Sequence, residues 1–201
     1  MITIVDYGVG NLGSVLNMFR YLGVPANVSS CLSVINKASK LLLPGVGAFD
    51  SAISRINSSG LRDVLDHKVL IKQTPILGIC LGAQLLTRGS EEGKLPGLGW
   101  IPAETSRFPS LLGLRVPHMG WNLVTPNTPS ELTQDLPLGS RFYFVHSYYI
   151  TVDSPQHSIL RTSYGIEFDS AIQCGNIYGT QFHPEKSHKF GMHLLKNFSN
   201  I

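Results

Sequence analysis

The chain has 201 residues, which is long enough for one sizeable domain, and we expect a single domain over residues 1–201. Charged residues make up only 14% of the chain, whereas an ordinary soluble chain carries about 25%. This shortage of charge fits either a large buried sheet or a face that a partner covers. The net charge of +3 comes from scattered lysines and arginines, so neither nucleic acid nor an anionic membrane is an expected partner.

Cysteine usage indicates a reducing compartment. Cys31, Cys80 and Cys174 lie far apart in the sequence, and no CxxC pair occurs. An odd number of cysteines without a secretion signal argues against a disulfide framework, so we expect a cytoplasmic protein. The chain opens in an apolar run rather than a basic leader, and no apolar stretch approaches the ~20 residues that span a bilayer.

The first half of the chain alternates short apolar runs with helical periodicity, a pattern typical of parallel α/β architecture. Continuous apolar runs predict strands at residues 2–5, 41–43 and 75–79. Apolar residues three or four positions apart predict helices around residues 15–22, 49–56 and 61–70, and residues 83–87 open another helix directly after the third strand.

From about residue 100 the pattern changes to short strands with frequent turns, which favours antiparallel or mixed pairing. Strands are predicted at residues 114–116, 142–149, 159–160, 171–173 and 177–182. A last helix is expected to close the chain, because Phe190, Leu194 and Phe198 are spaced by four.

The segment Gly8–Gly13 fits the G-x-G-x-x-G fingerprint of dinucleotide-binding sites, between a strand and a helix. Such a site also needs an acidic residue about 20 positions further on, which binds the ribose hydroxyls. No Asp or Glu occurs between Asp6 and Asp50. We therefore favour a tight glycine turn in this segment and expect no nucleotide cofactor.

Cys80 lies at the corner between a predicted strand and a predicted helix, within the sequence GICLG. This is the G-x-nucleophile-x-G form of an elbow, in which flanking glycines admit the crowded backbone that lifts a side chain out of the sheet. At the N-terminus of a helix, the helix dipole favours the reactive thiolate form of a cysteine. The alternative is a small buried hydrophobic residue, which is the commoner state of a lone cysteine.

His183 and Glu185 follow the last apolar strand, and their spacing places both on the same side of an extended backbone. A histidine that deprotonates a thiol needs its second ring nitrogen held by a carboxylate, which fixes the tautomer. The same two residues also fit an exposed turn. Metal ligation is a weaker alternative, because the seven histidines form no H-E-x-x-H pattern, and neither a metal nor another cofactor is expected.

The segment Pro44–Gly47, with the sequence PGVG, again lies between a buried strand and a helix. Its glycines let backbone N–H groups turn toward a developing negative charge. Taken alone, the segment is only a turn.

The motifs PGVG, GICLGAQ and HPEKS, in this order, resemble those of the class I (triad) glutamine amidotransferases. The resemblance implies that Cys80 is the nucleophile, that His183 is the general base and acid, and that Glu185 orients the histidine. It also implies an α/β fold with a twisted, mixed, mostly parallel sheet, helices on both faces and the site at the carboxyl ends of the strands. Ala83 departs from the family, which commonly has methionine there, and we expect this change to alter packing rather than chemistry.

The resemblance also implies the other parts of the site. The oxyanion hole would use the N–H of Leu81 and one from the PGVG segment, at Val46 or Gly47. The glutamine pocket would be lined by Gly45, Gln84, Glu92, Ser147 and Tyr148, with Glu91 as an alternative to Glu92.

Three further segments, Asp6–Asn11, Val116–Asn122 and Phe144–Tyr148, resemble the glutaminase subunits of imidazole glycerol phosphate synthases in histidine biosynthesis. This implies that glutamine is the substrate and that a β/α-barrel cyclase subunit is the partner in a heterodimer. The cyclase would use the ammonia to form imidazole glycerol phosphate and AICAR. The partner-facing residues would be Asn11, Trp121, His146 and Lys186.

Other functions stay open at this point. Residues 89–100 and 183–190 also resemble a paralogous glutaminase that supplies ammonia for the amidation of a surface-polysaccharide sugar. A cysteine peptidase or esterase would share the triad but would leave the segment Gly82–Gln84 idle. A non-catalytic interaction subunit would keep the fold without needing the nucleophile.

Overall fold

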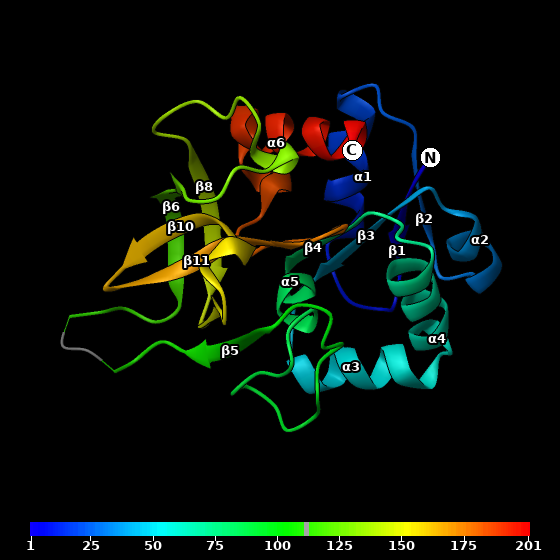
Figure 1. The fold of residues 1–201 in the computed structure, drawn as a ribbon, viewed down its shortest axis with the longest axis horizontal. Coiled ribbons are helices and arrows are strands. Elements are labelled where there is room, and N and C mark those ends of the chain that lie inside the picture. Colours follow the sequence, from blue (N-terminus) through cyan, green and yellow to red (C-terminus); the bar gives the residue numbers. More distant parts are fainter. Residues whose placement is uncertain (111–112) are drawn as a thin grey trace.

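The computed structural model describes residues 1–110 and 113–201 and is built around an eight-stranded sheet (Figure 1). In spatial order the strands are β2 (Ala26–Ser29), β1 (Ile2–Val5), β3 (Lys40–Gly45), β4 (Ile76–Cys80), β12 (Ile177–Thr180), β11 (Ile166–Cys174), β10 (Ser158–Tyr164) and β7 (Thr125–Pro126). Neighbours from β2 to β12 pair in parallel, and the pairs from β12 to β7 are antiparallel. The sheet is therefore mixed, with its parallel part formed mainly by the first half of the chain.

Helices cover both faces of this sheet (Figure 1). One face carries α1 (Leu12–Tyr21) and α6 (His188–Asn200), and the other carries α2 (Leu32–Lys37), α3 (Phe49–Ser58), α4 (Leu61–Asp66) and α5 (Leu81–Leu85). A π-helical turn, His67–Ile71, continues α4. Because side chains alternate along a strand, Val5 and Leu43 pack toward α3, whereas Ile4 and Leu42 pack toward α1. The two hydrophobic clusters lie on opposite faces of the sheet.

Two antiparallel strand pairs lie beside the central sheet. Strand β5 (Ala103–Arg107) pairs with β9 (Tyr148–Val152), and β6 (His118–Leu123) pairs with β8 (Arg141–His146). The register of the second pair places His118 opposite His146. Ser147, between β8 and β9, joins the two pairs, so this short segment is held from both sides.

The structure confirms the strands predicted in the first half, which correspond to β1, β3 and β4, and the predicted helices that overlap α1, α3, α4 and α6, with bounds that differ by a few residues. The helix expected at residues 83–87 begins earlier, at Leu81, directly after Cys80. The strand predicted over residues 142–149 is two strands, because the chain changes partner at Ser147. The strand predicted at residues 114–116 is wrong, since residues 113–117 form turns and irregular backbone.

Within residues 1–110 and 113–201, every helix is too short or too polar to cross a membrane. The same part of the chain contains no group of three or more His, Cys, Asp or Glu side chains placed to hold a metal ion.

Candidate active site

Cys80 is held in a strained backbone conformation between β4 and α5. Its φ of +54° and ψ of −110° lie outside the regions that side-chain-bearing residues normally adopt. A Cβ on Gly78 would approach the Gly82 carbonyl to 2.7 Å, and a Cβ on Gly82 would overlap the Leu43 carbonyl oxygen. The two glycines therefore let α5 pack directly against β3 and β4, and this close packing holds Cys80 at the tip of the elbow.

His183 and Glu185 form a buried pair next to Cys80. The distance from His183 Nδ1 to Glu185 Oε1 is 2.8 Å, and the exposed fractions of the two side chains are 2% and 3%. Burial opposes the charged imidazolium, but the adjacent Cys80 sulfur and the Glu185 carboxylate outweigh it and raise the pKa of His183 to about 9. Among the described residues, His183 Nε2 has no hydrogen-bond partner, so this nitrogen is available to the sulfur and to a substrate.

Backbone contacts fix the position of His183 at the end of β12. Its N–H donates to the Tyr143 carbonyl of β8 at 2.9 Å, and its carbonyl accepts from the Ser187 hydroxyl at 2.6 Å. The same hydroxyl oxygen accepts the Tyr143 N–H at 3.0 Å. Ser187 thus joins the histidine to β8, a role that its place in the HPEKS motif did not reveal.

A cavity of about 370 Å³ opens above Cys80. This volume suits a small ligand such as a free amino acid. Most of the residues expected at the site contribute to its wall, which is lined by Val46, Gly47, Cys80, Leu81, Gln84, Glu92, Pro117, Val145, His146, Ser147, Tyr148 and His183. Of the residues expected in the pocket, Gly45 is buried beneath the wall instead.

The structure separates the roles of the two adjacent glutamates. Glu92 lines the cavity, and its carboxylate accepts the Phe49 N–H at 3.1 Å, at the start of α3. Glu91 points elsewhere, because its carboxylate accepts the Arg107 N–H at 2.6 Å. Asp50 holds this loop by accepting the N–H groups of Lys94 and Leu95 at 2.9 to 3.0 Å.

The PGVG segment lies close to the start of α5, as an oxyanion hole requires. A Cβ on Gly45 would lie 3.0 Å from the Gly82 nitrogen and 3.0 Å from Leu81 Cβ. Gly47 has a φ of +106°, which favours glycine, and Val46 is 42% exposed at the mouth of the cavity. As the first residue of its helix, Leu81 has an N–H without an intrahelical acceptor.

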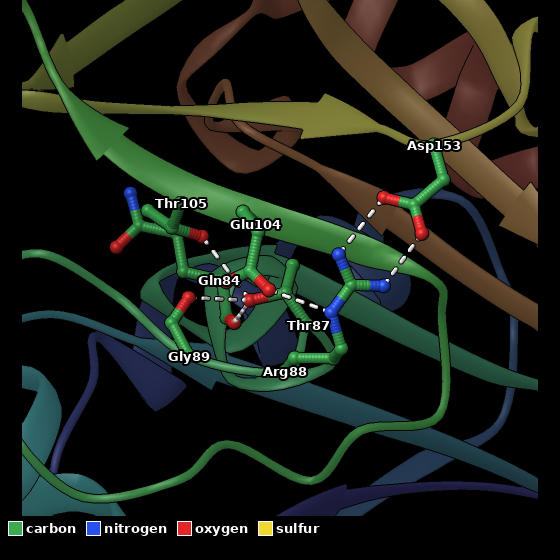
Figure 2. A network of polar contacts seen from close by, with 7 residues as sticks. All are labelled: Gln84, Thr87, Arg88, Gly89, Glu104, Thr105 and Asp153. Carbon is green, nitrogen blue, oxygen red and sulfur yellow. Dashed lines mark hydrogen bonds and ion pairs between the residues drawn. The ribbon is translucent and has the colours of Figure 1, made fainter.

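A polar network fixes the far end of α5 and thereby Gln84 (Figure 2). The Thr87 hydroxyl lies 2.8 Å from the Gln84 carbonyl and 2.9 Å from the Gly89 carbonyl. Arg88 donates to both carboxylate oxygens of Asp153, at 2.6 and 2.9 Å, and to Glu104 at 2.6 Å (Figure 2). The loop after α5 is therefore fastened to β5 and to the end of β9.

The four residues expected at a partner face occupy different positions. Asn11 caps α1 and is exposed, Lys186 is exposed with its ammonium 5.8 Å from the Tyr143 ring, and Trp121 is 47% exposed and stacks on His188. His146 differs from the expectation. Its exposed fraction is 6%, because it points inward from β8 and forms part of the cavity wall.

Sequence reasoning assigned no role to two residues that contact this site. Gln181 is buried, and its amide nitrogen lies 3.8 Å from the Cys80 sulfur. The Val145 carbonyl lies 4.0 Å from the same sulfur. An amide side chain within the predicted strand at residues 177–182 was the available signal for Gln181, whereas a backbone carbonyl leaves no signal in a sequence.

Comparisons with known proteins identify the family of this chain. The family model described as "Glutamine amidotransferase class-I" matches residues 3–200. The chain is 50% identical to imidazole glycerol phosphate synthase subunit HisH 2 of Pseudomonas aeruginosa and 48% identical to subunit HisH of Bdellovibrio bacteriovorus, each over 100% of both chains. In fold it is similar to the structure of PurLQS from Thermotoga maritima, with a TM-score of 0.73, 16% identity, and coverage of 99% of this chain and 97% of that one. The chain therefore belongs to the class I glutamine amidotransferase family.

Proposed function

We propose that this chain is the glutaminase subunit of imidazole glycerol phosphate synthase. Residues 1–201 act as one domain that hydrolyses glutamine to glutamate and ammonia, and a β/α-barrel cyclase subunit receives the ammonia. The observation that carries this proposal is the likeness along the whole chain to relatives that bear this name, at 48% and 50% identity. Three free cysteines support a reducing, cytoplasmic location.

Cys80 starts the reaction by attacking the carboxamide carbon of glutamine. The carbonyl oxygen takes up negative charge, which N–H groups of Leu81 and of Val46 or Gly47 stabilise. The raised pKa of His183 means that its ring carries a proton near pH 7, and this proton goes to the departing ammonia. The bond from carbon to nitrogen breaks, and a glutamyl thioester remains on Cys80.

Water completes the cycle. His183, now neutral, removes a proton from a water molecule, and the resulting hydroxide attacks the thioester carbon. The bond from carbon to sulfur breaks, glutamate leaves, and the Cys80 thiolate and the protonated histidine are restored. Glu185 orients the ring throughout, because its carboxylate holds Nδ1 at 2.8 Å.

The surface next to the cavity supports an association with another subunit. Along β6 the side chains alternate, and Met119, Trp121 and Leu123 are exposed at 62%, 47% and 48%. Val46, at the mouth of the cavity, is a further exposed apolar side chain, at 42% exposure. We propose that the cyclase subunit covers these residues, together with Asn11 and Lys186, so that ammonia meets its acceptor before bulk water.

The first test replaces the nucleophile. In Cys80→Ala, we expect glutamine hydrolysis to be lost while folding and titration with the partner stay unchanged, because only the attacking atom is removed. Glutamate release is measured with the partner and its ligand present. Glutamate release near the wild-type rate would show that Cys80 is not the nucleophile.

The second test identifies the ammonia acceptor. It is needed because the relative from Pseudomonas aeruginosa is named HisH 2, and such a number distinguishes one subunit from another of the same kind. The gene is expressed with its cognate barrel subunit in a histidine auxotroph that lacks its own glutaminase subunit, and ammonia is kept low. We expect growth without histidine. A soluble complex that hydrolyses glutamine but does not restore growth would instead favour the sugar-amidating paralogue.

A further inference from the structure

A row of hydrogen bonds joins strand β6 to the wall of the cavity. His146 Nδ1 lies 2.6 Å from the Tyr148 carbonyl oxygen, and His118 Nδ1 lies 2.9 Å from His146 Nε2. The amide nitrogen of Asn122 continues the row, 3.2 Å from His118 Nε2. Four residues from three segments of chain are thus connected, and the two histidines in the middle of the row are buried.

The Tyr148 carbonyl oxygen, at one end of the row, determines which atom donates in each hydrogen bond of the row. A carbonyl oxygen carries no hydrogen, so His146 Nδ1 must donate to Tyr148. In a neutral ring, His146 Nε2 is then an acceptor, and His118 Nδ1 must donate to it. His118 Nε2 in turn accepts from Asn122, whose amide orientation is fixed because its oxygen accepts the Leu123 N–H at 2.8 Å.

The surroundings of both rings favour this neutral state and hold it in place. Burial lowers the pKa of His118 to about 4 and that of His146 to about 3. The His118 ring is stacked between Phe144 and Tyr164, with centroid distances of 4.8 and 3.9 Å. The aromatic neighbours fix the plane of the His118 ring. Whether its two hydrogen bonds in the row can form therefore depends on which ring nitrogen carries the hydrogen.

The Tyr148 carbonyl oxygen is also connected to the Cys80 sulfur, through the side-chain amides of Gln84 and Gln181. Gln84 Nε2 donates to this carbonyl at 3.3 Å and to Gln181 Oε1 at 3.0 Å. The Gln181 amide nitrogen then lies 3.8 Å from the Cys80 sulfur. The position of one carbonyl oxygen therefore helps to orient the amides of Gln84 and Gln181, and Gln84 lines the cavity.

We propose that His118 and His146, both neutral with hydrogen on Nδ1, are positioning residues that hold the Tyr148 carbonyl and thereby shape the glutamine pocket through Gln84. Neither ring has to exchange a proton with the substrate. The inference rests on the proposed glutaminase activity, and it names two residues that act on that activity through a backbone carbonyl.

Two substitutions of His118 separate hydrogen bonding from packing. His118→Phe keeps a ring between Phe144 and Tyr164 but removes the donor to His146, which leaves a buried acceptor unpaired. His118→Asn loses the ring but retains an amide N–H near the position of Nδ1. The matched control is His193→Phe, since the His193 ring bonds the Gln134 carbonyl, outside this row.

Glutamine kinetics are measured on the full chain with the cyclase partner present. For His118→Phe we expect KM to rise about three- to tenfold, the effect of one lost hydrogen bond, with kcat within about twofold of wild type. His118→Asn should keep KM within about twofold while lowering the melting temperature. An unchanged KM in His118→Phe, or a larger rise in His118→Asn than in His118→Phe, would overturn the proposal.

A spectroscopic measurement decides the question if either variant fails to fold. In wild-type protein labelled with ¹⁵N-histidine, we expect the His118 and His146 signals of a protonated Nδ1 and a bare Nε2. A protonated Nε2 on His146 would overturn the proposal. This measurement does not need activity, so a wild-type chain that shows the expected tautomer but hydrolyses no glutamine would contradict the proposed function alone.

Discussion

Replacing Gly82 by alanine tests whether close backbone packing holds the elbow. The added Cβ would overlap the Leu43 carbonyl oxygen, and this atom belongs to β3, which cannot rotate away as a side chain can. Overpacking of this kind costs about 1–3 kcal/mol, even though alanine favours a helix more than glycine does. For a chain of this size, we expect a fall in melting temperature of about 2–12 °C.

The same change should also impair catalysis. To relieve the overlap, α5 must move away from β3, which separates Cys80 from the PGVG backbone. A displacement of about 1 Å at a reacting group can cost about a hundredfold in rate, so we expect a loss of this order in glutamate release.

Gly13→Ala is the matched control, because Gly13 is also the second residue of its helix, and a Cβ there would meet nothing within 4 Å. We expect Gly13→Ala to leave activity unchanged and to keep or slightly raise the melting temperature. Both quantities are measured by thermal denaturation and by glutamine hydrolysis with the partner present. If Gly82→Ala behaves like Gly13→Ala in both assays, the packing argument for the elbow is wrong.

Three further predictions concern pH, the loop that carries Glu92, and the partner. Because His118 and His146 have folded-state pKa values of about 4 and about 3, below the ordinary value, their stabilising effect is complete above pH 6.5 and is lost as the pH falls. Each should contribute a slope of up to about 1.4 kcal/mol per pH unit to the free energy of unfolding, and urea titrations should show a shallower slope in His118→Phe. Asp50→Ala removes the carboxylate that holds the loop carrying Glu92, so the KM for glutamine should rise by a larger factor than kcat changes. The control Asp63→Ala, at an exposed position in α4, should change neither constant in the same assay. The chain alone should hydrolyse glutamine about a hundredfold more slowly than the complex, which is the effect of one missing oxyanion donor. Equal rates in stopped assays with and without the partner would refute this prediction.

The residues proposed for catalysis were predictable because short-range sequence patterns encode them. A nucleophile between glycines and a His–x–Glu pair after a strand each specify local geometry, and the structure places Cys80, His183 and Glu185 together. The buried strands β1, β3 and β4 were predictable for a similar reason, since they are continuous apolar runs.

The parts that could not be predicted depend on long-range contacts. Strand β5 has the polar sequence AETSR and forms because it pairs with distant parts of the chain, chiefly with β9. His146 looked like a surface residue, yet its register opposite His118 turns it inward. Asp50 lies 44 residues before Lys94, whose N–H it accepts, and no spacing rule connects such positions.

The short strand β7 limits how this protein can associate with other copies of itself. The central sheet ends there in two residues, Thr125 and Pro126, and proline has no N–H to offer to a further strand. At the opposite end, β2 is four residues long, which gives an added strand little length to pair with. An extended segment of another chain therefore finds little template at either edge, and during crowded synthesis in the cell the folded monomer should resist edge-to-edge aggregation.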